Sequence, residues 1–215
     1  MLVDIISGLH KSGKRDYQSH MTLDKPENME VARRFGFDFW DGERKYGYGG
    51  YKDDGRWKPI AKKLIERYKL NRKSLVLDIG CGKGYLANEI SKISKAEVWG
   101  CDISEYALDN SPLKNKFRFN AGIDNLDDID EDFDLIISLN TLHNLTLPRL
   151  KQAIKQINSH SKQAYIVVES YRNTIELHNL TSWALTCEQF LRPEEWEFLF
   201  KEWGYKKDYE FIFFE

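Results

Sequence analysis

The chain has 215 residues, of which 32 are Lys or Arg and 34 are Asp or Glu, so its formal net charge is −2. This length is enough for one domain with a sizeable buried core. Because no net basic charge is present, no positive field would attract nucleic acid or an anionic membrane, and we expect neither as a partner.

The three cysteines, Cys81, Cys101 and Cys187, fit neither a disulfide framework nor a metal-ligand set. We therefore expect reduced thiols, no bound metal and a cytoplasmic location. The first ten residues contain Asp4 and only short apolar pieces, which fits neither a signal peptide nor a membrane span. The acidic stretch from Asp124 to Asp134 has no EF-hand spacing, so a solvated loop is favoured over a calcium site.

Residues 1–58 are predicted to form an N-terminal cap or lid, with a helix from Pro26 to Ala32. Between residues 35 and 57, eight of 23 residues are aromatic, where the chain's 13% would give about three, and six are Gly. Alternating Tyr and Gly is poor helix material, which favours an adaptable loop that faces a substrate. The alternative is an aromatic staple that packs this arm onto the core. The candidate substrate contacts are Tyr46, Tyr48, Tyr51 and Trp57.

Residues 59–215 are predicted to form the main domain, which begins with an amphipathic helix at Pro59. The apolar run from Leu75 to Ile79 predicts a buried parallel strand, and apolar residues at helical spacing from Tyr85 to Ile93 predict a helix. Three glycines at alternate positions lie in the turn between them. Such a turn lets a nucleotide-like ligand approach the backbone, because no Cβ stands in its way.

The turn has the pattern DxGxGxG, in which Asp78 precedes the glycines Gly80, Gly82 and Gly84. A dinucleotide-binding fingerprint would instead have the spacing GxGxxG. The DxGxGxG pattern resembles the S-adenosylmethionine (SAM) binding motif of class I methyltransferases. The resemblance extends to a second strand that ends at Asp102, 24 residues after Asp78, where the family places the carboxylate that binds both ribose hydroxyls.

Further strands are predicted to end at Asn120, Leu139 and Glu169, and a last strand is expected from Tyr209 to Phe214. Strands that alternate with helices predict an α/β fold with a doubly wound, mostly parallel sheet, helices on both faces and an N-terminal helical and aromatic cap. The resemblance implies a sheet of the seven-strand type. Its last hairpin is expected to be either shortened or completed by residues near 183–190.

The resemblance also implies how SAM would be bound. Asp78 would lie near the SAM amino group, Asp102 would bind the ribose, and Ile103 would flank the adenine. Asn120 stands where the family commonly has Asp; its amide oxygen can accept from the adenine amino group, and the Ala121 N–H can serve adenine N1. The predicted cofactor-binding residues are Asp78, Gly80, Cys81, Gly82, Gly84, Asp102, Ile103, Asn120, Ala121 and Asn140.

Two residues are candidate general bases for a hydroxyl acceptor. His143 follows the fourth strand, and an imidazole with a pKa near ~6.5 can take up a proton at neutral pH. Glu169 ends the fifth strand. The alternative for each is a structural hydrogen bond that fixes a neighbouring loop. Tyr171, Arg172 and Trp183 are predicted to shape the substrate pocket.

The sequence therefore predicts a SAM-dependent methyltransferase that acts on a small molecule and leaves S-adenosylhomocysteine (SAH), as a monomer or homodimer. Hydroxyl acceptors are slightly favoured over amines, because the aromatic-rich cap suits stacking on a ring and two candidate bases exist. The strand end at Asn140 lacks the Asn-Pro-Pro-aromatic pattern of enzymes that methylate amino groups of nucleic-acid bases. The alternatives are an NAD(P)-dependent oxidoreductase, a non-catalytic SAM-fold binding protein and methylation of a protein partner.

Overall fold

The computed structural model describes residues 1–11, 16–17, 22–114, 117–122, 126 and 129–215. Of the acidic stretch discussed above, Asp124, Asp127 and Asp128 lie outside these residues. The strands are β1 (Leu75–Ile79), β2 (Glu97–Asp102), β3 (Arg118–Asn120), β4 (Phe133–Leu139), β5 (Ser161–Glu169) and β6 (Asp208–Ile212). The helices are α1 (Ser7–Lys11), α2 (Lys25–Ala32), α3 (Phe37–Trp40), α4 (Trp57–Tyr68), α5 (Tyr85–Ser94), α6 (Glu105–Asp109), α7 (Leu147–His160), α8 (Thr174–Trp183) and α9 (Pro193–Glu202), with short 3-10 helices η2 (Arg44–Tyr46) and η4 (Leu142–Asn144).

The strands form one open sheet in the order β3-β2-β1-β4-β5-β6, and every neighbouring pair is parallel. The predicted doubly wound α/β sheet is confirmed, with six strands in place of seven. The expected terminal hairpin is corrected: β6 runs parallel to β5, because α9 returns the chain to the amino end of the sheet before β6 begins. Residues 184–190 form no strand, and the N–H groups of Glu188 and Gln189 donate instead to the His143 carbonyl.

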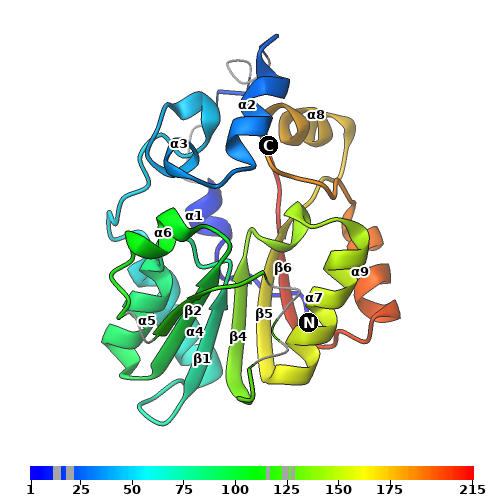
Figure 1. Ribbon diagram of the computed structural model, residues 1–215. Helices are drawn as coiled ribbons and strands as arrows, with labels where there is room; N and C mark the ends of the chain where they lie inside the picture. The colour runs from blue at the N-terminus through cyan, green and yellow to red at the C-terminus, as the bar shows by residue number, and fades with distance from the viewer. Residues whose placement is uncertain (12–15, 18–21, 115–116, 123–125, 127–128) are drawn as a thin grey trace.

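Helices cover both faces of the sheet because alternate strand residues point to opposite sides. Val76 of β1 packs with apolar residues of α4 and α5, whereas Leu77 and Ile79 pack with those of α7 and α9. The helix expected from Pro59 begins two residues earlier, at Trp57. Figure 1 shows α4 and α5 on the left of the sheet and α7 and α9 on the right.

The carboxyl ends of the strands bring the predicted site residues to one edge of the sheet. In the parallel register Asp78 is opposite Gly100, and Asp102 is opposite Asn120. Glu169 ends β5 at the same edge. This is where ligands bind in open α/β sheets.

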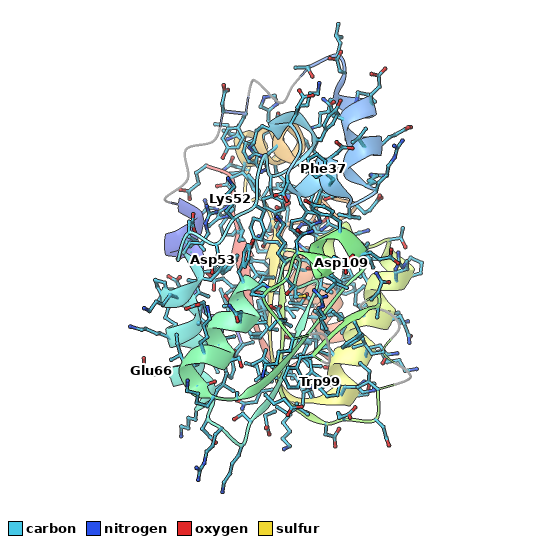
Figure 2. All side chains as sticks on the ribbon, turned by 60° about the vertical axis from the view of Figure 1, so that its left-hand side comes forward. Phe37, Lys52, Asp53, Glu66, Trp99 and Asp109 are labelled. Carbon is cyan, nitrogen blue, oxygen red and sulfur yellow. The ribbon has the colours of Figure 1, made fainter. Side chains whose placement is uncertain are left out.

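The cap lies over this edge. Figure 1 shows α2 and α3 in blue and α8 in gold above the carboxyl ends of the strands. In Figure 2, Phe37 of α3 lies near the upper end of the molecule, whereas Glu66 of α4 and Trp99 of β2 lie near the lower end. The predicted helix from Pro26 to Ala32 is confirmed as α2. The N-terminal aromatic segment therefore covers the edge at which a ligand is expected.

The first residues of the chain belong to the core. Leu2 forms an isolated parallel bridge to Tyr209, and Ile5 and Ile6 are buried. The carboxylate of Glu210 on β6 accepts hydrogen bonds from the N–H groups that precede α1, with a distance of 2.6 Å from Ile5 N. The division at residue 58 therefore stays a prediction. None of the helices in the described part of the chain is long and apolar enough to cross a bilayer.

Candidate active site

A cavity of about 660 Å³ lies between the cap and the carboxyl ends of β1, β4 and β5. Its floor includes Asp78, Gly80, Cys81, Gly82, Asn140, His143 and Glu169. Its upper wall comes from the cap and includes Phe39, Trp40, Arg44, Tyr48, Tyr51, Asp54, Arg56 and Trp57. Residues from α1, from the end of α8 and the segment after it, and from the end of the chain complete the wall: Leu9, His10, Trp183, Cys187 and Phe214.

The glycine loop takes a backbone conformation that favours Gly. Gly80, Gly82 and Gly84 have φ values of 69°, 55° and 69°. The N–H groups of Gly80 and Cys81 both donate to the carbonyl of Cys101, at 2.8 and 3.0 Å, which fixes the loop against the end of β2. A Cβ at Gly80 would lie 2.1 Å from the Thr141 hydroxyl oxygen. This loop therefore has no room for a larger residue.

Two polar groups at the floor have no hydrogen-bond partner among the residues that the structure describes. No hydrogen bond or ion pair to the Asp78 carboxylate is found among the described residues, although the residue is only 3% exposed. Burial, with a further contribution from the Asp102 charge, raises the pKa of Asp78 to about 7. The buried Oδ1 of Asn140 likewise has no partner in the described part of the structure, and this residue has a φ of 55°. Both oxygens can accept hydrogen bonds from a cationic group in the cavity.

Asp102 lies behind the cap. Its carboxylate accepts from Gly82 N at 2.7 Å and from Ser104 N at 2.8 Å, and burial raises its pKa despite these bonds. The Trp40 ring covers the same two residues: a Cβ at Gly82 would lie 2.5 Å from it, and its Nε1 donates to the Ser104 hydroxyl oxygen at 2.9 Å. Asp102 does not line the cavity. Since a carboxylate has about four acceptor positions, these bonds leave it able to accept from a ligand hydroxyl.

The predicted adenine contacts lie outside the cavity wall. Ile103 is 51% exposed, and Asn120 Nδ2 donates to its carbonyl at 3.1 Å, which leaves the amide oxygen of Asn120 as an acceptor. The Ala121 N–H, expected to serve adenine N1, donates to the Asp102 carbonyl at 3.3 Å instead. Gly84 also lies outside the wall. The structure thus separates the methionine half of the predicted set, which lines the cavity, from the adenosine half, which does not.

The two candidate bases lie in contact at the floor. His143 Nδ1 accepts from Glu169 N at 3.2 Å, and His143 Nε2 lies 3.4 Å from Glu169 Oε2. Burial lowers the pKa of His143 to about 3, so the ring is neutral. Because Nδ1 accepts a hydrogen bond, the ring proton must be on Nε2, facing the Glu169 carboxylate. The Nε2–H of His143 therefore faces the Glu169 carboxylate.

The aromatic segment both packs on itself and lines the cavity. Trp40 and Tyr48 are stacked, with ring centroids 5.2 Å apart, and Tyr51 stacks on Tyr85 at 5.3 Å. The predicted substrate contacts Tyr48, Tyr51, Trp57 and Trp183 line the cavity, whereas Tyr46, Tyr171 and Arg172 do not.

Arg172 is held elsewhere. Its guanidinium forms ion pairs with Glu176 and with Glu215, the latter at 2.6 Å, and lies 4.1 Å over the ring of Phe213. Tyr171 lies under the guanidinium of Arg192. The contacts of Arg172 join Phe213 and Glu215 to the start of α8.

The sequence did not point to four residues that join the cap to the glycine loop. Lys83, between two of the motif's glycines, is only 4% exposed and is paired with Asp41, which follows α3. Trp40 and Tyr106 complete this contact. A Lys in a loop is normally solvated, so its burial is visible only once its partner is located in space.

Residues 76–164 match the family model described as a methyltransferase domain. A SAM-dependent methyltransferase from Archaeoglobus fulgidus has a similar structure, with 25% identity and a TM-score of 0.54 over 75% of this chain and 72% of that chain. This chain carries a class I SAM-dependent methyltransferase domain. The strand order alone would not separate it from dinucleotide-binding folds, which share it, whereas the glycine spacing and the family match do.

The matches to curated proteins are partial. The rat mitochondrial protein named arginine-hydroxylase NDUFAF5 is 38% identical over 104 residues, which cover 46% of this chain and 29% of the relative. An rRNA adenine N-6-methyltransferase from Enterococcus faecalis is 25% identical over 123 residues, covering 55% of this chain and 50% of the relative. The chain thus spans half or less of the length of these curated relatives. The plantazolicin methyltransferase BpumL, solved with SAH, has a similar fold, with 19% identity and a TM-score of 0.56 over 86% of this chain and 77% of that chain.

The residues at the floor fit SAM, the cofactor of this family. Asp78 and the amide oxygen of Asn140 offer acceptors for the ammonium group of SAM, and Asp102 keeps acceptor positions for the ribose. Gly is required at positions 80 and 82, because a Cβ there would clash with Thr141 or Trp40. The cofactor prediction is thereby confirmed at the level of the family, and the role of each residue stays a prediction.

Proposed function

We propose that this methyltransferase transfers a methyl group from SAM to a small molecule, with a hydroxyl group slightly favoured over an amine as the acceptor. The observation that carries this proposal is the cavity under the cap, which joins the glycine loop to the Glu169–His143 pair between aromatic walls. A cavity of about 660 Å³ is within the usual range for small-molecule sites. Aromatic rings suit a flat or sugar-like acceptor.

Glu169 is the proposed general base. SAM, when bound, supplies an electrophilic methyl group on a sulfonium, and the acceptor oxygen must lose its proton as it is methylated. The Glu169 carboxylate would accept that proton while the Nε2–H of neutral His143 holds the carboxylate in place. Positioning by Tyr48, Tyr51 and Trp57 would supply the rest of the acceleration, since in-line displacement depends mainly on geometry.

The first test is calorimetric titration with SAH, with NADH as the control. Binding of SAH alone supports the proposal, whereas binding of NADH alone would return the oxidoreductase alternative. Acceptors are then screened by mass spectrometry for the gain of one methyl group. The panel includes rRNA and ribosomal protein, because relatives are named as methyltransferases of each. It also scores hydroxylation, because one relative is named an arginine-hydroxylase.

Glu169→Gln tests the role of the base once an acceptor is known. For a hydroxyl acceptor we expect kcat to fall about 10²- to 10³-fold, as on the loss of a general base, with SAH affinity changed less than about twofold. Glu188→Gln is the matched control, because Glu188 pairs with Arg33 outside the cavity wall. An unchanged kcat in Glu169→Gln would leave this residue with a purely structural role.

A further inference from the structure

Asp41 and Lys83 form an ion pair between the cap and the glycine loop. The Lys83 Nζ lies 2.7 and 2.6 Å from the two carboxylate oxygens of Asp41. The side chains are only 5% and 23% exposed. Lys is almost never buried without a partner, so the position of Lys83 depends on Asp41.

The pair is completed by further hydrogen bonds. Lys83 Nζ donates a third bond to the Tyr51 carbonyl at 3.0 Å, which accounts for all three of its donors. Asp41 accepts from the Tyr106 hydroxyl at 2.7 Å and from Tyr51 N at 3.2 Å. Burial on its own would raise the pKa of Asp41, but the bonds from Lys83 and Tyr106 outweigh it and hold the pKa below its usual value. The pair therefore joins the cap to the glycine loop and to α6.

Trp40, the residue before Asp41, covers Asp102, the carboxylate that is predicted to bind the ribose. Trp40 packs on Gly82 and donates to Ser104, and the N–H groups of these two residues hold Asp102. Asp102 is consequently only 8% exposed and lies outside the cavity. SAM must reach both Asp78, inside the cavity, and Asp102, behind Trp40, to be held as the fold predicts. Because Trp40 packs on Gly82 and Ser104, the Trp40–Asp41 segment covers the approach to Asp102.

We propose that Asp41 and Lys83 are positioning residues that form a clasp, which holds the cap closed on the glycine loop and must open for SAM to enter and SAH to leave. The proposal deepens the proposed function and rests on the SAM site described above. An ion pair suits a reversible clasp, because opening returns both charges to water, and their hydration offsets most of the attraction that is lost. An apolar contact of similar size would lose its burial on opening without such an offset.

The test is a stopped-flow measurement of SAH association and dissociation with the whole chain, in which intrinsic tryptophan fluorescence is the signal. In Asp41→Asn we expect both rate constants to rise about tenfold, the change that follows loss of a charge-assisted hydrogen bond from the closed state. The dissociation constant should change less than either rate constant. Asp38→Asn is the matched control, because Asp38 is an exposed carboxylate of α3, the helix that Asp41 follows, and we expect its rate constants to equal those of the wild type.

The double variant Asp41→Asn/Lys83→Met separates the clasp from a general loss of stability, because it leaves no buried charge without a partner. It should also exchange SAH about tenfold faster than the wild type, even where Asp41→Asn alone is poorly folded. Wild-type rate constants in both variants would overturn the clasp. A wild-type protein that binds no SAH would contradict the proposed function itself, a different result from SAH binding at unaltered rates.

Discussion

The floor and the cap of the cavity are held by different kinds of contact. At the floor, the parallel register of β1 and β2 places Asp78 and Asp102, and backbone hydrogen bonds from Gly80 and Cys81 to Cys101 fix the loop between them. The cap rests on stacked rings and on the Asp41–Lys83 pair. Side-chain contacts can separate and re-form without unfolding the sheet. The floor is therefore suited to binding, and the cap to controlling access.

The largest effects are expected from a substitution that disturbs the floor. Gly80→Ala places a Cβ 2.1 Å from the Thr141 hydroxyl oxygen at a φ of 69°. We expect SAH binding to be lost and the free energy of unfolding to fall by about 2–4 kcal/mol, from backbone strain and overpacking. Titration with SAH and urea unfolding measure the two effects.

The control for Gly80→Ala is Gly36→Ala in the cap. Gly36 has a φ of −86°, and a Cβ there would meet nothing within 4 Å. We expect nearly unchanged SAH affinity and stability in this variant. Equal effects at the two glycines would show that floor and cap are equally rigid, which would contradict the difference between them described above.

Asp78→Asn separates the contribution of a floor residue to SAH affinity from its contribution to the free energy of unfolding. Loss of the charge that would accept from the SAM ammonium should weaken SAH binding about 10- to 100-fold. The same change should stabilise the ligand-free protein at high pH. Burial raises the folded-state pKa of Asp78 to about 7, above the ordinary value of 3.8, so the wild type loses stability as pH rises between these values.

Urea unfolding of Asp78→Asn and wild type at about pH 5 and about pH 8 measures this effect. The variant should gain roughly 1–4 kcal/mol relative to wild type between the two conditions, as the buried carboxylate of the wild type ionises. A difference in unfolding free energy that does not depend on pH would show that Asp78 is not desolvated at the floor.

His143→Gln gives the smallest of these effects. The folded-state pKa of His143 is about 3, below the ordinary 6.5, because the ring is buried. Its contribution to stability is therefore complete above about pH 6.5 and is lost as pH falls toward 3, by up to about 1.4 kcal/mol per pH unit. Between about pH 6 and about pH 5, the wild type should lose about that much stability relative to the variant in urea unfolding. Parallel pH dependences of the two proteins would contradict the buried, neutral ring.

Local patterns in the sequence were sufficient for the first five strands of the sheet and for several residues that line the cavity floor. Apolar runs and helical spacing located β1, β4 and α5, since each pattern depends only on residues close in the chain. The glycine spacing pointed to Asp78 and the family resemblance to Asn140, and both line the cavity floor because the parallel neighbours β1 and β4 end at the same edge. The parallel last strand was missed, since strand direction depends on where α9 leaves the chain and not on composition.

The class of fold, the cofactor family and the positions of Asp78 and Asp102 near the ends of the first two strands could all be predicted from the sequence. Each of them depends on a short-range pattern, and such patterns recur in each strand and helix of a parallel sheet. Only the tertiary structure decided that Lys83 is buried against Asp41, that Trp40 covers the approach to Asp102, and that His143 faces Glu169 as a neutral donor. These contacts join residues 26 to 64 positions apart in the chain, and no local pattern encodes them. The burial that changes the charge state of Asp78 and His143 is likewise a property of the packed molecule.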